Sequence, residues 1–230
     1  MASPIPSRSY DASLTLRQEH ECTFAELSSL LAAIGKDFYS HGWTFGTGGN
    51  FSAVVETDPL RLAITPTSVD KGTLASSDIL EINEAGDVLS GRSRPSYEHL
   101  LHLAIVNTRS AGAVLHTHSV WATVLSQREA ARRGLAIEGY EMLKGLEGVK
   151  THEHREWVPI LSNCQDMVQL AALVKAMLDD NPAAHGFLLQ GHGLYTWGRT
   201  LLEAKRHVEI FEFLFEVLGR TTDGWEQRSR

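Results

Sequence analysis

Short apolar stretches that follow one another across tight, glycine-containing turns limit this chain to folds in which neighbouring strands run antiparallel. Such strand pairs are predicted at 50–56 with 60–67, within 79–91, and within 186–198, and further strands at 112–118, 137–143 and 156–162. Amphipathic helices are predicted from a capping box at 23–26 to residue 38, and at 96–105, 120–133, 166–178 and 201–218. The chain is predicted to have more strands joined by hairpins than a simple β-α-β alternation would contain. We therefore expect an α/β fold, a single three-layer α/β/α domain over residues 1–230 with a central, largely antiparallel mixed sheet.

Composition excludes several classes of protein. The formal charge of −7 with no basic run argues against a nucleic-acid partner. No segment approaches the roughly 20 apolar residues that cross a bilayer, so no membrane association is expected. The two cysteines lie far apart and form no disulfide framework, which favours the cytoplasm. Residues 1–12 lack the apolar stretch of a signal peptide and are predicted to form a disordered tail.

Two histidines one residue apart end the apolar run AVLHTH at 113–118. Successive side chains of a strand alternate between faces, so His116 and His118 point the same way and Thr117 points the other way. Two imidazoles on one face could share a metal ion, or they could be two ordinary half-buried histidines. A third candidate, His192, lies between two glycines in QGHG, where a ligand can come close to the backbone. Three histidines with an open fourth position are typical of catalytic zinc.

The other histidines have weaker support. His152 and His154 share the H-x-H spacing, but they lie in the charged stretch THEHRE, which predicts a solvated loop. His99 and His102 are three apart on a predicted helix, where packing or surface positions are expected. No local pattern supports a role for the remaining four, which are His20, His41, His185 and His207.

Three hydroxyl-rich or glycine-rich loops could bind an anion. GTGGN at 46–50 frees backbone N–H groups, and it is neither a Walker loop nor a dinucleotide-binding loop, although it could be only a tight turn. TPTS at 65–68 adds hydroxyls, and Ser96 precedes a predicted helix. Together they predict a phosphate site formed by Thr47, Gly48, Asn50, Thr67, Ser68, Ser96 and Lys71.

Two glutamates are candidate acids or bases. Glu98 lies at the start of its predicted helix, where acidic residues are favoured on any helix. Glu141 lies between Tyr140 and Met142, and apolar neighbours would raise its pKa toward neutrality. It could equally be an exposed glutamate on an edge strand.

Taken together, the motifs resemble those of the class II aldolase/adducin family. The residues that carry the resemblance are GTGGNFS, ITPTS, RPSYE, GAVLHTHS and GHGLYTWG, in family order and spread over residues 24–218. The resemblance implies one Zn²⁺ per subunit, held by His116, His118 and His192. It also implies the phosphate site named above, apart from Lys71, a phosphorylated ketose substrate, and active sites at the interfaces of a homotetramer.

Within the family, EMLKG at 141–145 makes the chain most similar to a dehydratase branch. That similarity implies zinc-dependent removal of water from 5-methylthioribulose 1-phosphate in methionine salvage, with Glu141 as the acid/base. A sugar-phosphate aldolase or epimerase, with Glu98 as the acid/base, is the alternative reaction. A non-catalytic scaffold like adducin is a further alternative, but all three predicted metal ligands are present.

Overall fold

The computed structural model describes residues 22–226, with side chains as far as residue 221, and the tail predicted for residues 1–12 lies outside this range. The strands are β1 (Asn50–Thr57), β2 (Leu60–Ile64), β3 (Leu80–Asn83), β4 (Val88–Ser90), β5 (Ala113–Thr117), β6 (Gly134–Ile137), β7 (Glu156–Leu161), β8 (Gly186–Leu189) and β9 (Gly193–Gly198). In the described part of the chain they form one sheet in the order β4-β3-β2-β1-β5-β9-β8-β7-β6. Every neighbouring pair is antiparallel except β7 and β8, which are parallel. The predicted mixed, largely antiparallel sheet is confirmed.

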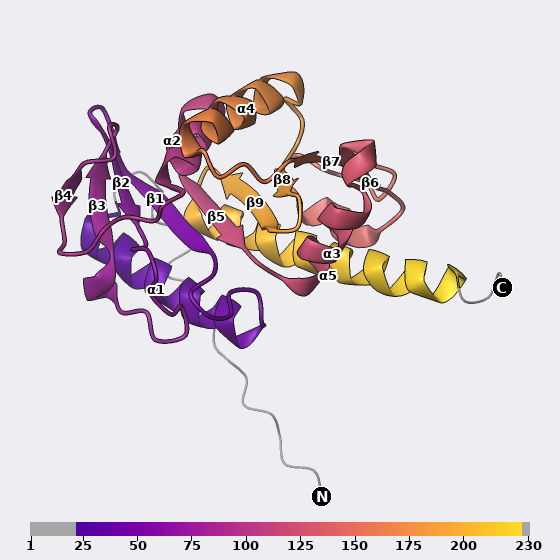
Figure 1. The fold of residues 1–230 in the computed structure, drawn as a ribbon, viewed down its shortest axis with the longest axis horizontal. Coiled ribbons are helices and arrows are strands. Elements are labelled where there is room, and N and C mark those ends of the chain that lie inside the picture. Colours follow the sequence, from indigo (N-terminus) through magenta and orange to yellow (C-terminus); the bar gives the residue numbers. More distant parts are fainter. Residues whose placement is uncertain (1–21, 227–230) are drawn as a thin grey trace, which may run out of the picture.

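Helices cover both faces of the sheet and complete three layers (Figure 1). They are α1 (Phe24–Ser40), α2 (His99–Arg109), α3 (Val120–Arg128), α4 (Met167–Asp180) and α5 (Leu201–Glu226). The helices α2 and α4 pack on one face through a core that includes Leu101, Leu170 and Tyr195. The helices α1, α3 and α5 lie on the other face, over two further clusters of buried apolar residues. Burial of apolar surface on both faces of the sheet is the main force that holds these layers together.

Local sequence signals explain most of the element boundaries. Helix α1 begins with the predicted capping box, in which the Thr23 and Glu26 side chains each accept a hydrogen bond from the other residue's backbone N–H. The hairpin between β3 and β4 turns at Gly86, whose φ of +83° is accessible to glycine at no steric cost. Helix α3 is shorter than the predicted 120–133, because a separate 3-10 turn follows it at η3 (Ala130–Arg132).

The strand predicted at 137–143 is wrong. Strand β6 lies earlier in the sequence and ends at Ile137, and the chain then turns at Gly139, which has a φ of +82°. Residues Glu141–Gly145 form the 3-10 helix η4. The side chains of Leu143 and Leu146 are both buried, and a spacing of three residues suits a 3-10 turn rather than a strand.

One end of the central strands gathers the predicted metal ligands. His116 in β5 pairs with Tyr195 in β9, and the turn before β9 carries His192. Because β5 and β9 are antiparallel neighbours, the C-terminal end of one meets the N-terminal end of the other. Histidines 76 residues apart in the chain are therefore brought to the same edge of the sheet.

Candidate metal and active site

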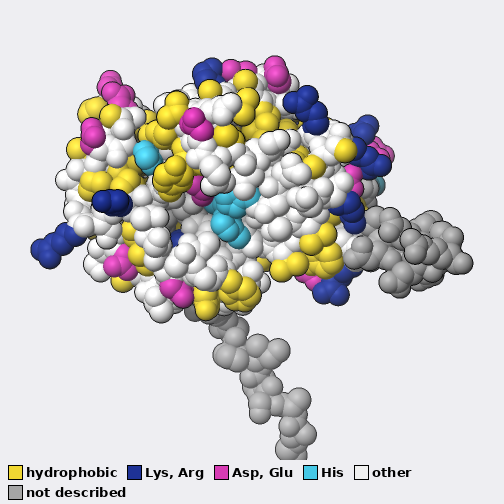
Figure 2. All heavy atoms as spheres, viewed as in Figure 1, with side chains coloured by type: hydrophobic (Ala, Val, Ile, Leu, Met, Phe, Trp, Pro, Cys, Tyr) yellow, Lys and Arg dark blue, Asp and Glu magenta, His cyan; other side chains and the backbone are white. Residues whose placement is uncertain are grey.

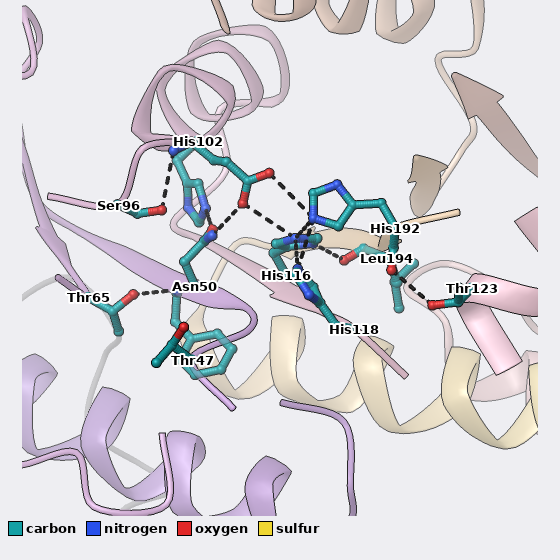
Figure 3. A network of polar contacts seen from close by, with 12 residues as sticks. Thr47, Asn50, Thr65, Ser96, His102, His116, His118, Thr123, His192 and Leu194 are labelled. Atoms are coloured by element: carbon teal, nitrogen blue, oxygen red, sulfur yellow. Dashed lines mark hydrogen bonds and ion pairs between the residues drawn. The ribbon is translucent and has the colours of Figure 1, made fainter. Parts of the chain in front are cut away.

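The imidazole rings of His116, His118 and His192 point at one another (Figure 3). The Nε2 atoms of His116 and His118 lie 2.7 Å apart, those of His118 and His192 lie 2.9 Å apart, and those of His116 and His192 lie 3.3 Å apart. The carboxylate of Glu98 completes the group, with oxygens 3.5 Å from His116 Nε2 and 3.6 Å from His192 Nε2. We call these four residues the first cluster. Figure 2 shows histidine side chains reaching the surface near the middle of this face, so the cluster is open to a ligand.

Backbone contacts fix the ring of His116 and the main chain at His192. His116 Nδ1–H donates to the carbonyl oxygen of Leu194 at 2.8 Å, which leaves Nε2 as the nitrogen with the free lone pair. The carbonyl oxygen of His192 accepts from Thr123 Oγ1 at 3.0 Å. Gly193 passes so close to β5 that a Cβ atom there would lie 1.9 Å from the carbonyl oxygen of Thr117. Only glycine allows this approach, which explains the glycine after His192.

The three histidines are neutral at physiological pH. Burial, together with the charges of His192 and Lys71, lowers the pKa of His118 to about 3. Burial, with the charges of its two neighbours, holds the pKa of His116 well below its usual range, and burial also lowers that of His192. The lone pair of His116 Nε2 faces the Nε2 atoms of His118 and His192, and with their protons on Nδ1 the three neutral rings present converging lone pairs to a cation. The first cluster therefore fits a divalent metal ion, with nitrogen and oxygen donors.

A buried hydrogen-bond network holds Glu98 against the histidines. The Asn50 amide nitrogen donates to Glu98 Oε2 at 2.6 Å, and the Asn50 amide oxygen accepts from Nε2 of His102. His102 Nδ1 then accepts from the hydroxyl of Ser52 at 2.7 Å. Since Asn50 donates on one side and accepts on the other, the network has a single consistent direction. It fixes the orientation of the Glu98 carboxylate.

A sequence profile of the class II aldolase and adducin N-terminal domain matches residues 29–218. The chain belongs to the class II aldolase and adducin family. The methylthioribulose-1-phosphate dehydratase of Marinobacter nauticus is 41% identical over 194 residues, which are 84% of this chain and 92% of that protein. The enzyme of the same name from Pseudomonas aeruginosa is 43% identical over 192 residues, 83% of this chain and 92% of that protein.

Solved structures show the same fold. The crystal structure of an L-fuculose 1-phosphate aldolase superposes with a TM-score of 0.72 at 25% identity, covering 90% of each chain. Within residues 22–226 of the present chain, no helix has the length and apolarity needed to cross a membrane.

The Tyr195 hydroxyl in this aldolase-type site was not predicted from the sequence. The Tyr195 ring stacks on His116 with centroids 3.9 Å apart, and its buried hydroxyl interacts with the Glu98 carboxylate. Burial, and then the negative charge of Glu98, raise its pKa well above the usual value. Tyr195 therefore stays neutral and supplies a packed wall behind the His116 ring.

The three predicted phosphate loops lie side by side. Lys71 Nζ donates to the Thr47 carbonyl oxygen at 3.1 Å, which joins the loop 46–50 to the loop 65–71. Ser96 N–H donates to the carbonyl oxygen of Thr65 at 3.2 Å, which joins the third loop to the second. Gly48 lies against the first cluster, because a Cβ atom there would be 2.9 Å from His118 Nδ1.

The residues of the predicted phosphate site differ in their exposure and in whether their polar groups already have hydrogen-bond partners. Thr47, Thr67 and Ser68 are exposed, whereas Ser96 is buried and its hydroxyl accepts from the Glu98 N–H. Both ends of the Asn50 amide are already engaged by Glu98 and His102. Lys71 is buried, and burial lowers its pKa to about 8. Phosphate binding by this set remains a prediction.

Glu141 does not have the environment predicted for it. Its side chain is 72% exposed on η4 and forms an ion pair with Lys144 at 2.6 Å. The hydrogen bond and charge of Lys144 lower its pKa, the opposite of the predicted rise, because Met142 and Tyr140 do not shield it from water. Within its own chain, Glu141 is not among the groups that converge in the first cluster.

Sequence reasoning also missed the supporting role of His102. A packing or a surface position is expected for it, and the structure shows it fully buried. The available signal was its spacing from Glu98, since residues four apart lie on the same face where a helix begins. Nothing local in the sequence linked either residue to Asn50, because strand β1 and helix α2 meet only in the folded chain.

Proposed function

We propose that this chain is a zinc-dependent methylthioribulose-1-phosphate dehydratase of methionine salvage, acting in the cytoplasm. It would convert 5-methylthioribulose 1-phosphate to 2,3-diketo-5-methylthiopentyl 1-phosphate and water. The observation that carries the proposal is the convergence of His116, His118 and His192 beside three hydroxyl-bearing loops, in a chain more than 40% identical to proteins of that name. The substrate's phosphate and ketone are the groups that such loops and such a metal site bind.

The first cluster would hold the metal through its three imidazoles. When bound, the ion polarises the C2 ketone and stabilises the negative charge that develops on its oxygen. Zinc suits three neutral histidines with a further position left for substrate. The loops that carry Thr47, Ser68 and Ser96 would bind the phosphate and position C3 and C4, which lowers the entropic part of the barrier.

Dehydration requires a group that removes the C3 proton and helps the C4 hydroxyl to leave as water. We assign this proton transfer to Glu141, as its place in EMLKG implies. Because Glu141 is exposed and outside its own first cluster, it would act on the site of a neighbouring copy in a homotetramer. Burial at that interface would raise its pKa toward the range useful for proton transfer.

A sugar-phosphate aldolase is the second candidate. Its support is that Glu98, only 13% exposed, lies beside the three histidines of the first cluster, in the place needed for an acid/base that works next to the metal. In the dehydratase, the same Glu98 would instead be oriented by Asn50 as a metal-facing carboxylate. The two functions thus assign the proton transfer to different glutamates.

The deciding experiment follows 5-methylthioribulose 1-phosphate and L-fuculose 1-phosphate by phosphorus NMR with the zinc-loaded protein. Rapid dehydration of the first, lost in His116→Ala, is expected. Cleavage of the second without dehydration of the first would replace the dehydratase by the aldolase. No reaction with either, from protein with full zinc occupancy, would contradict both.

A further inference from the structure

A second group of potential metal ligands lies outside the first cluster. His154 Nε2 lies 2.8 Å and His185 Nδ1 lies 3.0 Å from the same carboxylate oxygen, Oε2 of Glu156. We call these three residues the second cluster. All three offer donor atoms within 4.8 Å of one another. The sequence around His154 predicts a solvated loop, and no local pattern supports a role for His185.

The second cluster is built from buried and fixed groups. Glu156 is 1% exposed, and its other oxygen, Oε1, accepts from the backbone N–H of His185 at 3.0 Å. His185 Nε2–H donates to the carbonyl oxygen of Glu147 at 2.8 Å. That bond places the lone pair of neutral His185 on Nδ1, which faces Oε2 of Glu156. A backbone carbonyl that orients the far nitrogen of a histidine is the usual support of a metal ligand.

The space between the donors calls for positive charge. In neutral His185, the Nδ1 lone pair and the Glu156 carboxylate would face each other at 3.0 Å and repel. A second proton on His185 removes that repulsion. Burial alone would lower the pKa of His185, but the hydrogen bond and charge of Glu156 outweigh burial and raise that pKa. A cation bound by His185, His154 and Oε2 together would remove the repulsion as well, in competition with that proton.

A cavity adjoins the second cluster. Its volume is about 830 Å³, and His154, His185, Glu147 and Trp197 are among the residues that line it. An ion on the cluster could therefore complete its coordination with water or with a small ligand from the cavity. Three protein ligands and an accessible remaining position are sufficient for a bound metal ion.

We propose that His154, Glu156 and His185 bind a second divalent metal ion of the zinc type. Two imidazole nitrogens and one carboxylate oxygen favour zinc, cobalt or nickel over magnesium and calcium, which prefer oxygen donors. The inference is independent of the proposed dehydration. It concerns a site that the conversion of the sugar phosphate does not use.

The position of the second cluster indicates a structural role for this ion. His185 precedes β8 and the turn with His192 follows it, and β8 has four residues, about 13 Å in extended form. The metal ions of dinuclear catalytic sites lie only about 4 Å apart. The second ion would instead join the first residue of β7 to the loop with His154 and to the residue before β8, and so stabilise this end of the sheet.

The test removes the first cluster and measures what remains. A full-length His116→Ala/His118→Ala variant is stripped of metal, loaded with Zn²⁺, desalted and measured by mass spectrometry of the metal. We expect about one Zn²⁺ per chain in this variant and a rise in its thermal unfolding midpoint on loading, because metal that binds only the folded state stabilises it. Adding His154→Gln, at a side chain 28% exposed, should abolish both.

His152→Gln is the matched control, because it removes the other histidine of the H-x-H pair, which lies outside the second cluster. It should leave the zinc content and the rise in midpoint unchanged. The proposal is overturned if the starting variant is folded and binds no zinc, with nitrogen NMR showing His185 protonated on both nitrogens at pH 7. It is also overturned if His152→Gln lowers the zinc content as much as His154→Gln does.

Discussion

The two histidine clusters lie at opposite ends of β8. They differ in whether a metal ion or protons can occupy the space between their donor atoms. In the first cluster, His116, His118 and His192 direct three nitrogens at one another. A single proton can be shared by only two of them, so a metal ion is the natural occupant. In the second cluster the rings of His154 and His185 face a carboxylate, and protons can also satisfy this arrangement.

The clusters also differ in what orients them. Side chains hold the first cluster's carboxylate, through the chain from Ser52 to His102 to Asn50 to Glu98. Backbone groups of Glu147 and His185 hold the second cluster. Two clusters of the same residue types therefore differ in how strongly they require a metal ion, which is greater where the lone pairs have no other partner. They also differ in how readily mutation changes their metal binding, which is greater where side chains support the ligands.

The largest expected effect is a loss of activity, which we expect from a change in the first cluster and not from one in the second. His192→Ala should lower kcat/KM for 5-methylthioribulose 1-phosphate by roughly 10⁴-fold, since the Lewis acid supplies several kcal/mol to the transition state. Its zinc content at the first cluster should fall in parallel. His154→Gln, the corresponding change in the second cluster, should keep its turnover. Equal losses in the two variants would mean that the clusters form one functional unit.

The next largest effect distinguishes Glu98, inside the first cluster, from Glu141, on the surface. Glu141→Gln should lower kcat by about 10²-fold to 10³-fold through loss of proton transfer, with zinc content unchanged. Mixing and reassembling inactive Glu141→Gln and His116→Ala subunits should restore up to about one quarter of the activity, because some sites then combine intact residues from both chains.

The matched change Glu98→Gln should alter zinc affinity as well as rate, because Glu98 lies against the ligands. If mixed oligomers form but no activity returns, the assignment of Glu141 to a neighbour's site fails. If only Glu98→Gln is inactive, the proton transfer belongs to Glu98 and the aldolase becomes the better proposal.

Much of this arrangement could be predicted from the sequence, and the reasons differ from residue to residue. The alternation of a strand places His116 and His118 on one face, and the glycines of QGHG mark His192 as a turn residue. Hairpin spacing predicted the antiparallel sheet. The second cluster was missed because Glu156 and His185 are 29 residues apart and meet only when β7 and β8 pair in parallel. The environment of Glu141 was missed because a 3-10 turn replaced the expected strand.

A smaller effect tests the side-chain support of the first cluster. His102→Leu should weaken zinc binding or lower kcat/KM by about 10-fold to 100-fold, because Asn50 loses the partner that orients its amide toward Glu98. His102→Gln should recover most of the loss, since its amide can donate to Asn50 and accept from Ser52. Zinc titration with a competing chelator measures both variants. If neither differs from the unmodified chain, the network is only a packing feature.

The smallest effect is on stability, and it follows from a contrast between two buried carboxyl groups, those of Glu156 and Glu212. At the second cluster, burial raises the pKa of Glu156, but hydrogen bonds and charge from His185, with a further bond from His154, outweigh it and the net pKa is lowered. Behind the first cluster, burial raises the pKa of Glu212 to about 7, against the hydrogen bonds from Ser119 and Thr117. Glu212 Oε1 accepts from Thr117 Oγ1 at 2.6 Å, so it supports the residue between two metal ligands.

The raised pKa of Glu212 makes stability depend on pH in a defined direction. Below about pH 4.5 this carboxyl is protonated in the folded and unfolded chains alike, and it imposes no cost. Between about pH 4.5 and 7, the unfolded chain has released this proton whereas the folded chain still holds it. The free energy of unfolding therefore falls across this window, by on the order of 3 kcal/mol at most, and no longer changes with this group above about pH 7. Glu212→Gln removes the ionisation but can still accept from Thr117. Urea denaturation should therefore find the stability of the variant, relative to the unmodified chain, greater at pH 8 than at pH 4, whereas parallel pH profiles for the two proteins would show that Glu212 is already ionised in the folded state.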